Sequence, residues 1–396
     1  MLHAQEKFRR RHLLKLTGLG SAILTMPLGN RTEARPHQTT PDVDDDTARR
    51  PRRRSLDTRL TEAYGVQYPF VGAGMGFVAM PPLVAAVSKA GGIGVLGAAL
   101  EPPPGLQQLI QLIKGLTSHL FGVDFLHDTT AFGPAVTEAH IDVCLAEAVP
   151  LVVFHFNVPP PVWVDRLQAG GAKVWMQAAS AEQAMQAADI GIDAIIAQGV
   201  QAGGHVKSTT RTIELLHQIK KAVDPLIVLA AGGIADGAGV ARALANGAEG
   251  VWVGTRLVAS TEAYAHEEYK RRLTHASGHA TAITTAFGPE YPNVPYRLLR
   301  NRVVKAVAGH EDELPNPPPP PATIGATVLF PFTLRVPYTM PQFSAVIPTP
   351  DTIGDFEEMS LPAGEERVKL LKAIKPAAQI VAEMMAEARA LLAEAR

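Results

Sequence analysis

The chain has 396 residues, of which 46% are hydrophobic and 19% charged, a composition typical of a globular protein that can bury a large core. The formal net charge of −1 excludes a strong overall field that would attract nucleic acid or an anionic membrane. Cys144 is the only cysteine, so an intramolecular disulfide and a cysteine-rich zinc site are both excluded. Because Cys144 lies in an apolar, helix-like run, we expect a buried and unreactive thiol.

Residues 1–34 have the pattern of an export signal. Arg10 and Arg11 precede an apolar stretch at residues 16–28, and a basic segment before a short apolar one is typical of a signal peptide. The paired arginines predict an exported protein that uses the twin-arginine machinery. The stretch is shorter than the roughly 20 residues that span a bilayer, so stable membrane insertion is not expected. Residues 35–56, rich in proline and charge, predict a disordered linker.

Residues 57–261 contain alternating strand and helix patterns. Short apolar runs occur at residues 69–73, 94–98, 120–125, 151–156, 173–177, 194–198, 226–230 and 250–254, with helical patterns between most of them. Apolar strands that alternate with helices indicate a parallel sheet covered by helices. Eight such units predict a (β/α)8 TIM barrel. A doubly wound open sheet is the alternative, but it would concentrate unusual residues at one switch point, whereas here they follow nearly every strand.

The pattern changes after the eighth predicted strand. Residues 262–273 and 297–307 have helical patterns, a proline run occupies 317–321, and a segment rich in proline and aromatic residues follows. We expect residues 262–362 to form a small cap over the barrel mouth. Residues 363–396 end in an Ala/Glu/Leu-rich pattern that Pro376 interrupts, which predicts a final helix packed on the barrel.

A G-x-G-x-x-G pattern at residues 92–97 does not indicate a dinucleotide site. That fingerprint must follow a strand and begin a helix, whereas this one follows a helical pattern and enters a strand. The sequence also holds no P-loop, no G-x-S-x-G elbow and no H-E-x-x-H motif, so no metal site is predicted.

Glycine-rich loops follow several of the predicted strands. Residues 72–76 follow the first strand and would let a flat ligand approach the main chain, although an ordinary tight turn is also compatible with them. Residues 198–205 follow the sixth strand and end in His205. Because active sites of barrels of this kind lie after the strands, we predict that His205 is catalytic.

Two further loops predict a phosphate site. Residues 230–237 follow the seventh strand, and Gly254 and Thr255 follow the eighth. Loops at these two places form the common phosphate site of this fold. Main-chain N–H groups at a helix start, together with the Thr255 hydroxyl, can hold a phosphate dianion. Asp236 is better explained as a helix N-cap than as a ligand.

These motifs resemble those of nitronate monooxygenases, formerly called 2-nitropropane dioxygenases. The resemblance rests on the glycine-methionine turn, the A-Q-G-x-x-A-G-G-H loop, and A-A-G-G-I followed by A-x-G-A and V-x-x-G-T-R. It implies FMN as cofactor, with His205 as the catalytic base. By matching positions, it implies phosphate contacts from Gly232, Gly233, Gly254 and Thr255 and flavin contacts from Ala73, Gly74, Met75, Asp124, Gln177 and Gly204.

Three positions depart from the sequence pattern of this family. Asp124 replaces the usual asparagine, so a carboxylate is expected beside the flavin. Lys207 replaces a common glycine and adds a cation near the mouth. His155 places a second imidazole at the end of the fourth strand, either as a substrate contact or as a polar strand end.

The resemblance implies oxidation of alkyl nitronates or nitroalkanes by O2 to carbonyl compounds and nitrite. The alternatives are an FMN-dependent NAD(P)H reductase of quinone or enoyl substrates and a flavin-binding protein without turnover. The same motifs occur in FMN-dependent enoyl-ACP reductases and a related NADH:quinone reductase, so they define fold and cofactor better than substrate. A neutral His205 is expected to take the α-proton or to position the substrate, since its intrinsic pKa of about 6.5 suits that role.

Overall fold

The computed structural model describes residues 55–277, 279–314 and 321–394. The predicted export signal, nearly all of the predicted linker and most of the proline run lie outside these residues. Leu56, at the end of the predicted linker, is buried in the core, so ordered structure begins slightly earlier than expected. Within the described ranges, no helix has the length and apolar character needed to cross a bilayer.

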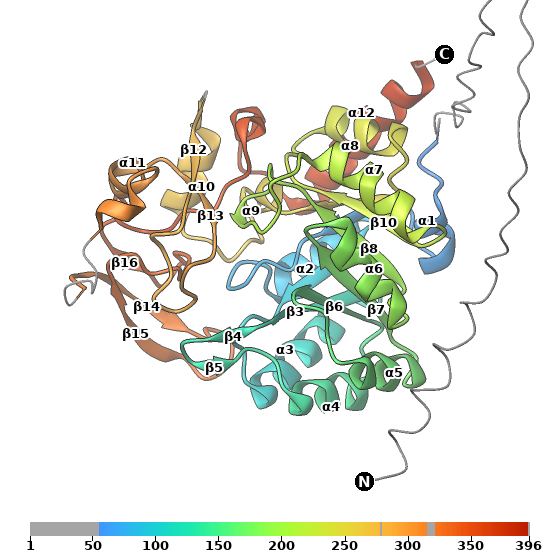
Figure 1. The fold of residues 1–396 in the computed structure, drawn as a ribbon, viewed down its shortest axis with the longest axis horizontal. Helices are drawn as coiled ribbons and strands as arrows, with labels where there is room; N and C mark the ends of the chain where they lie inside the picture. Colours follow the sequence, from blue (N-terminus) through green and yellow to red (C-terminus); the bar gives the residue numbers. More distant parts are fainter. Residues whose placement is uncertain (1–54, 278, 315–320, 395–396) are drawn as a thin grey trace, which may run out of the picture. The chain divides into compact units, whose positions relative to one another are not determined.

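The fold is the predicted TIM barrel. Its parallel strands are β1 (Phe70–Gly72), β2 (Ile93–Gly97), β3 (Phe121–His127), β6 (Leu151–Phe156), β7 (Lys173–Ala178), β8 (Ala194–Gln198), β10 (Ile227–Ala231) and β11 (Gly250–Val253). They pair in chain order, and β11 returns to β1 to close the barrel. Figure 1 shows these strands surrounded by the helices that connect them.

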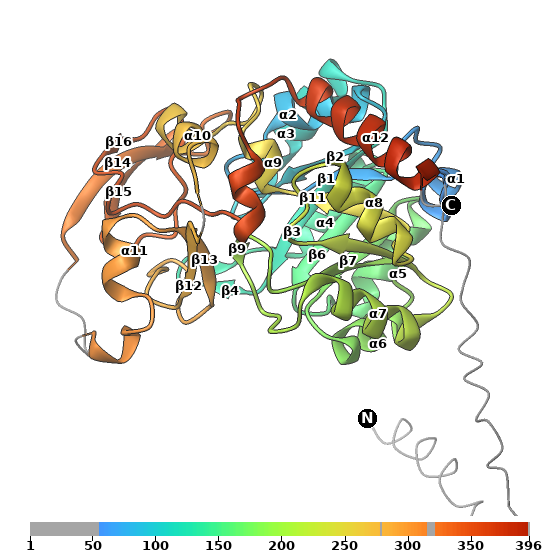
Figure 2. The ribbon, with the colours of Figure 1, turned by 90° about the horizontal axis from the view of Figure 1, so that it is seen from above.

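The outer ring consists of helices that follow the strands. These are α2 (Pro81–Lys89), α3 (Pro103–Leu116), α4 (Glu138–Ala146), α5 (Pro161–Ala169), α6 (Ala181–Asp189), α7 (Thr212–Val223) and α8 (Gly237–Ala245). Only a short helix, α9 (Thr255–Val258), follows β11. The predicted final helix, α12 (Ala377–Glu394), packs against both α8 and α2 and completes the ring (Figure 2). Because Pro376 lacks an N–H group, it precedes the helix rather than interrupting it.

Alternating side chains of each strand point into the barrel. The interior cluster includes Val153, Trp175 and Ile196, whereas their neighbours Phe154 and Met176 face the outer helices. At the amino-terminal end of the barrel, α1 (Arg59–Tyr64) closes the interior: Leu60 joins the cluster, and the Trp175 indole donates to the Tyr64 hydroxyl at 2.5 Å.

The same alternation places polar side chains in the last interior layer at the carboxyl end. Asp124, His155, Gln177 and Gln198 each lie two residues beyond an interior position of their strand. All four line a pocket there. The barrel interior is therefore apolar below this layer. The layer itself forms the polar floor of the pocket.

In the described residues, the cap contains two small sheets and two α-helices. Strands β12 (Thr281–Thr284), β13 (Tyr296–Leu299) and β9 (Gly204–His205) form one sheet, and β14 (Thr323–Leu329), β15 (Val336–Pro341) and β16 (Ile353–Gly354) form the other. The helices are α10 (Glu267–Thr274) and α11 (Arg302–Val307). A short hairpin of β4 (Thr129–Thr130) and β5 (Gly133–Pro134) follows β3.

Two helices of the cap differ from their predicted limits. The helix predicted at residues 297–307 is wrong in its first part, because β13 pairs with β12 on one side and β9 on the other. The helix predicted at 262–273 begins only at Glu267, where the His266 imidazole accepts a hydrogen bond from the Glu268 N–H at 3.0 Å. A sequence pattern does not reveal such long-range strand partners.

Candidate functional site

One pocket at the carboxyl ends of the strands brings together every residue that the sequence predicted for the site. It is lined by Ala73, Gly74, Met75, Asp124, Gln177, Gly204, His205, Gly232, Gly233, Gly254 and Thr255, among others. These residues come from five of the eight barrel strands or the loops after them, and from β9. The location is the one where enzymes of this fold have their active sites.

The loop after β1 forms one side of the pocket, and its main chain is closely packed there. A Cβ atom on Gly74 would lie 2.3 Å from the Cβ of Asp124, and one on Gly97 would lie 2.3 Å from the carbonyl carbon of Met75. Neither position can hold a side chain without a shift of the backbone. The glycines therefore let the loop after β1 lie directly on the polar floor.

The loop after β10 forms a second, glycine-lined wall. Gly232 and Gly233 have φ angles of +114° and +67°, which side chains rarely adopt. A Cβ atom on Gly232 would also lie 2.9 Å from the Ala202 nitrogen and the Thr212 hydroxyl oxygen. Among the described residues, no acceptor takes a hydrogen bond from the Gly232 or Gly233 amide. These two N–H groups are available to an anion.

The start of α8 is less available than the sequence suggested. Asp236 is the N-cap, as predicted, and its carboxylate accepts from the Gly239 N–H at 2.7 Å. The Gly237 N–H donates to the Glu387 carboxylate at 2.8 Å. Because carboxylates already occupy these amides, the helix start is not the anion site. The Thr255 oxygen accepts from the Gly364 N–H at 3.0 Å, so its own O–H can still donate.

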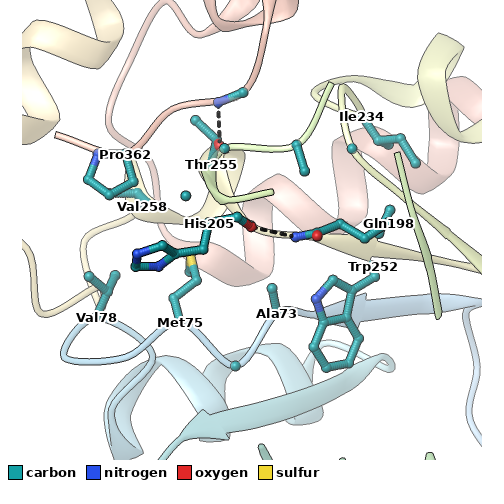
Figure 3. Close-up of a pocket in the computed structure, with 18 of the residues that line it drawn as sticks. Ala73, Met75, Val78, Gln198, His205, Ile234, Trp252, Thr255, Val258 and Pro362 are labelled. Carbon is teal, nitrogen blue, oxygen red and sulfur yellow. Dashed lines mark hydrogen bonds between the residues drawn. The ribbon is translucent and has the colours of Figure 1, made fainter. Parts of the chain in front are cut away.

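His205 is held by the cap sheet. It pairs with Tyr296 of β13, and the two rings stack with centroids 4.0 Å apart and planes 1° apart. The Gln198 side chain donates to the His205 carbonyl at 3.3 Å, as Figure 3 shows. The Nε2 atom of His205 is buried and has no hydrogen-bond partner in the described part of the chain. A polar atom of this kind is available to a ligand.

Burial disfavours a proton on the imidazole of His205. It lowers the pKa of His205 to about 3, with smaller contributions from the neighbouring His155 and Lys207. The neutral state agrees with the sequence prediction. The low pKa makes His205 a weaker proton acceptor than its intrinsic value of about 6.5 suggested.

Asp124 and His155 form a pair in the floor of the pocket. The Asp124 carboxylate lies 2.9 Å from the Nδ1 atom of His155. Both side chains are largely buried, with 6% and 16% exposed, respectively. Burial raises the pKa of Asp124, and the adjacent imidazole opposes this shift. His155 and Asp124 therefore line the pocket together.

Lys207 and Asp128 form a second charged pair near the mouth. The Lys207 ammonium lies 3.3 Å from the Asp128 carboxylate and 4.4 Å from the centre of the Phe156 ring. The Tyr291 hydroxyl also donates to Asp128. The cation that the sequence placed near the mouth is thus compensated by a carboxylate and an aromatic face.

One wall of the pocket was not predicted from the sequence. It comes from the segment before α12. Residues Ile347, Pro362, Gly364, Glu365, Val368 and Leu371 line it, as does Tyr269 of α10. Contacts between distant residues place this segment: the Glu365 N–H donates to the Gln201 carbonyl at 3.0 Å, and Leu298 pairs with Pro362. No local pattern signals such contacts, although Gly364 and the prolines mark an extended segment.

Comparison with known proteins agrees with this architecture. The family described as nitronate monooxygenase matches residues 57–387. A probable nitronate monooxygenase of Staphylococcus aureus strain Newman is 31% identical over 299 residues, covering 66% of this chain and 83% of that protein. FabK from Thermotoga maritima has a TM-score of 0.70 and 30% identity, covering 85% of this chain and 98% of that one.

A structure of nitroalkane oxidase from Streptomyces ansochromogenes has a TM-score of 0.66 and 28% identity, covering 84% of this chain and 99% of that one. The family match spans the barrel, the cap and most of the final helix. With the barrel architecture and the clustered motif residues, these matches show that the chain is an oxidoreductase of the nitronate monooxygenase family.

Proposed function

We propose that the pocket binds FMN. The observation that carries this is the pair of available amides at Gly232 and Gly233, which line the same pocket as the free donor of Thr255. These groups and Gly254 would hold the phosphate. The main chain of Ala73–Met75 would face the ring system, because the glycine at its centre lets it approach a flat ligand closely.

The remaining predicted contacts suit the polar edge of a flavin. Gln177 and Gly204 offer an amide side chain and a main-chain group, and Asp124 offers a carboxylate whose charge His155 can compensate. When bound, FMN would supply the redox chemistry, with O2 as the final electron acceptor. The protein would supply orientation and a pocket screened from water.

We further propose that the substrates are small alkyl nitronates and nitroalkanes, which are oxidised to carbonyl compounds and nitrite. Family membership supports this reaction. His205 is the proposed catalytic residue: its unpartnered Nε2 atom would contact the substrate. Apolar side chains such as Val78, Val258 and Ile347 also line the pocket and suit a short alkyl group.

The second candidate is an NAD(P)H-dependent reductase of quinone or enoyl substrates. It is supported by the motifs that the reductases share and by the similarity to FabK, which has the higher TM-score of the two structures compared above. Because fold and cofactor are shared, the substrate has to be tested directly.

Purified, FMN-loaded protein mixed with a nitronate in air should release nitrite in proportion to the oxygen consumed. Anaerobic mixing with NADH or NADPH should leave the flavin absorbance unchanged on the timescale of nitronate turnover. Rapid bleaching by NADH or NADPH together with absence of nitrite would instead establish the reductase. Absence of both activities from protein that carries flavin would support a flavin-binding protein without turnover.

Export through the twin-arginine machinery is also a proposal, supported by the sequence of residues 10–28 alone. A route that carries folded proteins would suit a cofactor loaded before export. Fractionation of producing cells tests it: retention of the wild-type chain in the cytoplasm would contradict the proposal.

A further inference from the structure

The imidazole of His205 is held by ring contacts rather than by hydrogen bonds. Its Nε2 atom is buried without a partner, and no side chain in the described ranges forms a hydrogen bond or an ion pair with the ring. A functional histidine is often oriented by a hydrogen bond from its other ring nitrogen to a carboxylate or a carbonyl group. The orientation of this imidazole therefore comes from packing.

Three aromatic rings surround the imidazole, and that of Tyr296 lies flat against it. The centroids of the His205 and Tyr296 rings are 4.0 Å apart and their planes differ by 1°. The rings of Tyr291 and Phe156 meet the imidazole edge-on, at centroid distances of 5.2 Å and 5.9 Å and interplanar angles of 78° and 85°. Rotation of the imidazole would break its parallel contact with Tyr296. The stack thus fixes the plane in which Nε2 lies.

The backbone of the cap sheet brings the two stacked rings together. His205 and Tyr296 are directly paired residues of the antiparallel strands β9 and β13, so their side chains lie on the same face of the sheet. Tyr296 is only 2% exposed and packs in the cap cluster with Phe287 and Leu298. Its hydroxyl donates to the Ala345 carbonyl at 3.4 Å. A side chain locked by its own packing can hold its neighbour in one orientation.

We propose that Tyr296 is the positioning residue of His205, and that its ring face holds the imidazole in the orientation that presents Nε2 to the substrate. The proposal rests on the proposed function, in which His205 contacts the substrate through that atom. Both residues line the pocket. The stack uses the face of the Tyr296 ring, whereas the hydroxyl is bonded to the cap, so the ring is required and the hydroxyl is not.

The test compares Tyr296→Leu with Tyr296→Phe in FMN-loaded protein. Leucine keeps an apolar side chain in the cap but removes the ring face, so turnover of nitroethane and of ethyl nitronate should fall about 100-fold, the cost of a displacement of about 1 Å. The loss should appear in kcat rather than in KM, because the stack determines how the imidazole is oriented rather than how tightly the substrate binds. Phenylalanine keeps the ring face, so Tyr296→Phe should retain wild-type turnover.

Phe287→Leu is the matched control for loss of an aromatic ring from the cap. Phe287 is buried in the same cap cluster as Tyr296, but it lies outside the residues that line the pocket. Its replacement by leucine leaves the stack on His205 in place. The control should therefore lower the melting temperature while turnover and FMN content stay at the wild-type level. The absorption spectrum gives the FMN content of each variant, to which its turnover is normalised.

A second measurement does not depend on turnover. The face of an aromatic ring shields protons that lie over it, so the carbon-bound ring protons of His205 should have upfield NMR signals in protein with isotopically labelled histidine. His205→Gln identifies these signals by their absence. They should move downfield in Tyr296→Leu but stay upfield in Tyr296→Phe and in Phe287→Leu.

Several outcomes would overturn the positioning role of Tyr296. Wild-type turnover in a folded Tyr296→Leu protein would reject this inference alone, as would a loss in Tyr296→Phe or Phe287→Leu as large as that in Tyr296→Leu. His205 signals at ordinary positions in the wild type would reject it without any change at Tyr296, even if the leucine variant does not fold. A wild-type protein that turns over neither nitroethane nor ethyl nitronate would reject the proposed function and, with it, this role.

Discussion

Gly232→Val is expected to weaken FMN binding by on the order of 100-fold or more. Gly232 has a φ of +114°, and a Cβ atom there would lie 2.9 Å from the Ala202 nitrogen. A side chain in a conformation of this kind costs about 1–3 kcal/mol, and about 1.4 kcal/mol corresponds to a tenfold change in affinity. Valine is also β-branched and would collide with the loop at Ala202. The wall that carries the amides of Gly232 and Gly233 must therefore move.

Quenching of FMN fluorescence on titration with apoprotein measures this effect. Gly171→Val is the matched control, because Gly171 also has a positive φ, +88°, but a Cβ atom there would meet nothing within 4 Å beyond its chain neighbours. It lies between α5 and β7, outside the residues that line the pocket. The control should lose stability but keep FMN affinity. A folded Gly232→Val protein with wild-type affinity would show that this wall does not hold the cofactor.

His205→Ala is expected to retain bound FMN and to lose turnover of nitronate and nitroalkane alike, by about 100-fold. A displacement of the substrate by about 1 Å can cost this much. The residue touches the pocket through its ring, whereas its main chain is held by β13 and Gln198. Truncation of the ring should therefore leave the backbone of the loop in place.

The pH profile separates this role from that of a titrating base. Because the pKa of His205 lies at about 3, its imidazole stays neutral above about pH 4, and no limb of the wild-type profile above that pH should belong to it. Steady-state rates of nitrite release for wild type, His205→Ala and the exposed-site control His119→Ala provide the measurement. Undiminished nitrite release by His205→Ala would reject a catalytic role.

The barrel could be predicted from the sequence because each strand is a local apolar run. Residues such as Val153 and Ile196 inside, with Phe154 and Met176 outside, make these runs apolar on both faces, and glycines mark where helices end. The pocket residues could be predicted for the same reason. Parallel strands end at one edge, so loops far apart in sequence meet there without any knowledge of their contacts.

The cap and the pairings within the pocket could not be predicted in this way. The strand at Tyr296–Leu299 forms because it pairs with His205, about ninety residues earlier by numbering, and its local pattern is equally compatible with a helix. Asp124 and His155 were each noted in the sequence, but only the neighbouring register of β3 and β6 brings them into contact. The occupied amides at the start of α8 depend on Glu387, from a helix distant in sequence.

We infer that the main-chain amides at Gly232 and Gly233 hold the phosphate of FMN at the mouth of the barrel. The most direct test is the absorption spectrum of purified protein before and after incubation with FMN and removal of the unbound cofactor. We expect a yellow protein that retains one FMN per chain but does not retain riboflavin, which lacks the phosphate. A protein that stays colourless after incubation with FMN, or that retains riboflavin equally well, would contradict it.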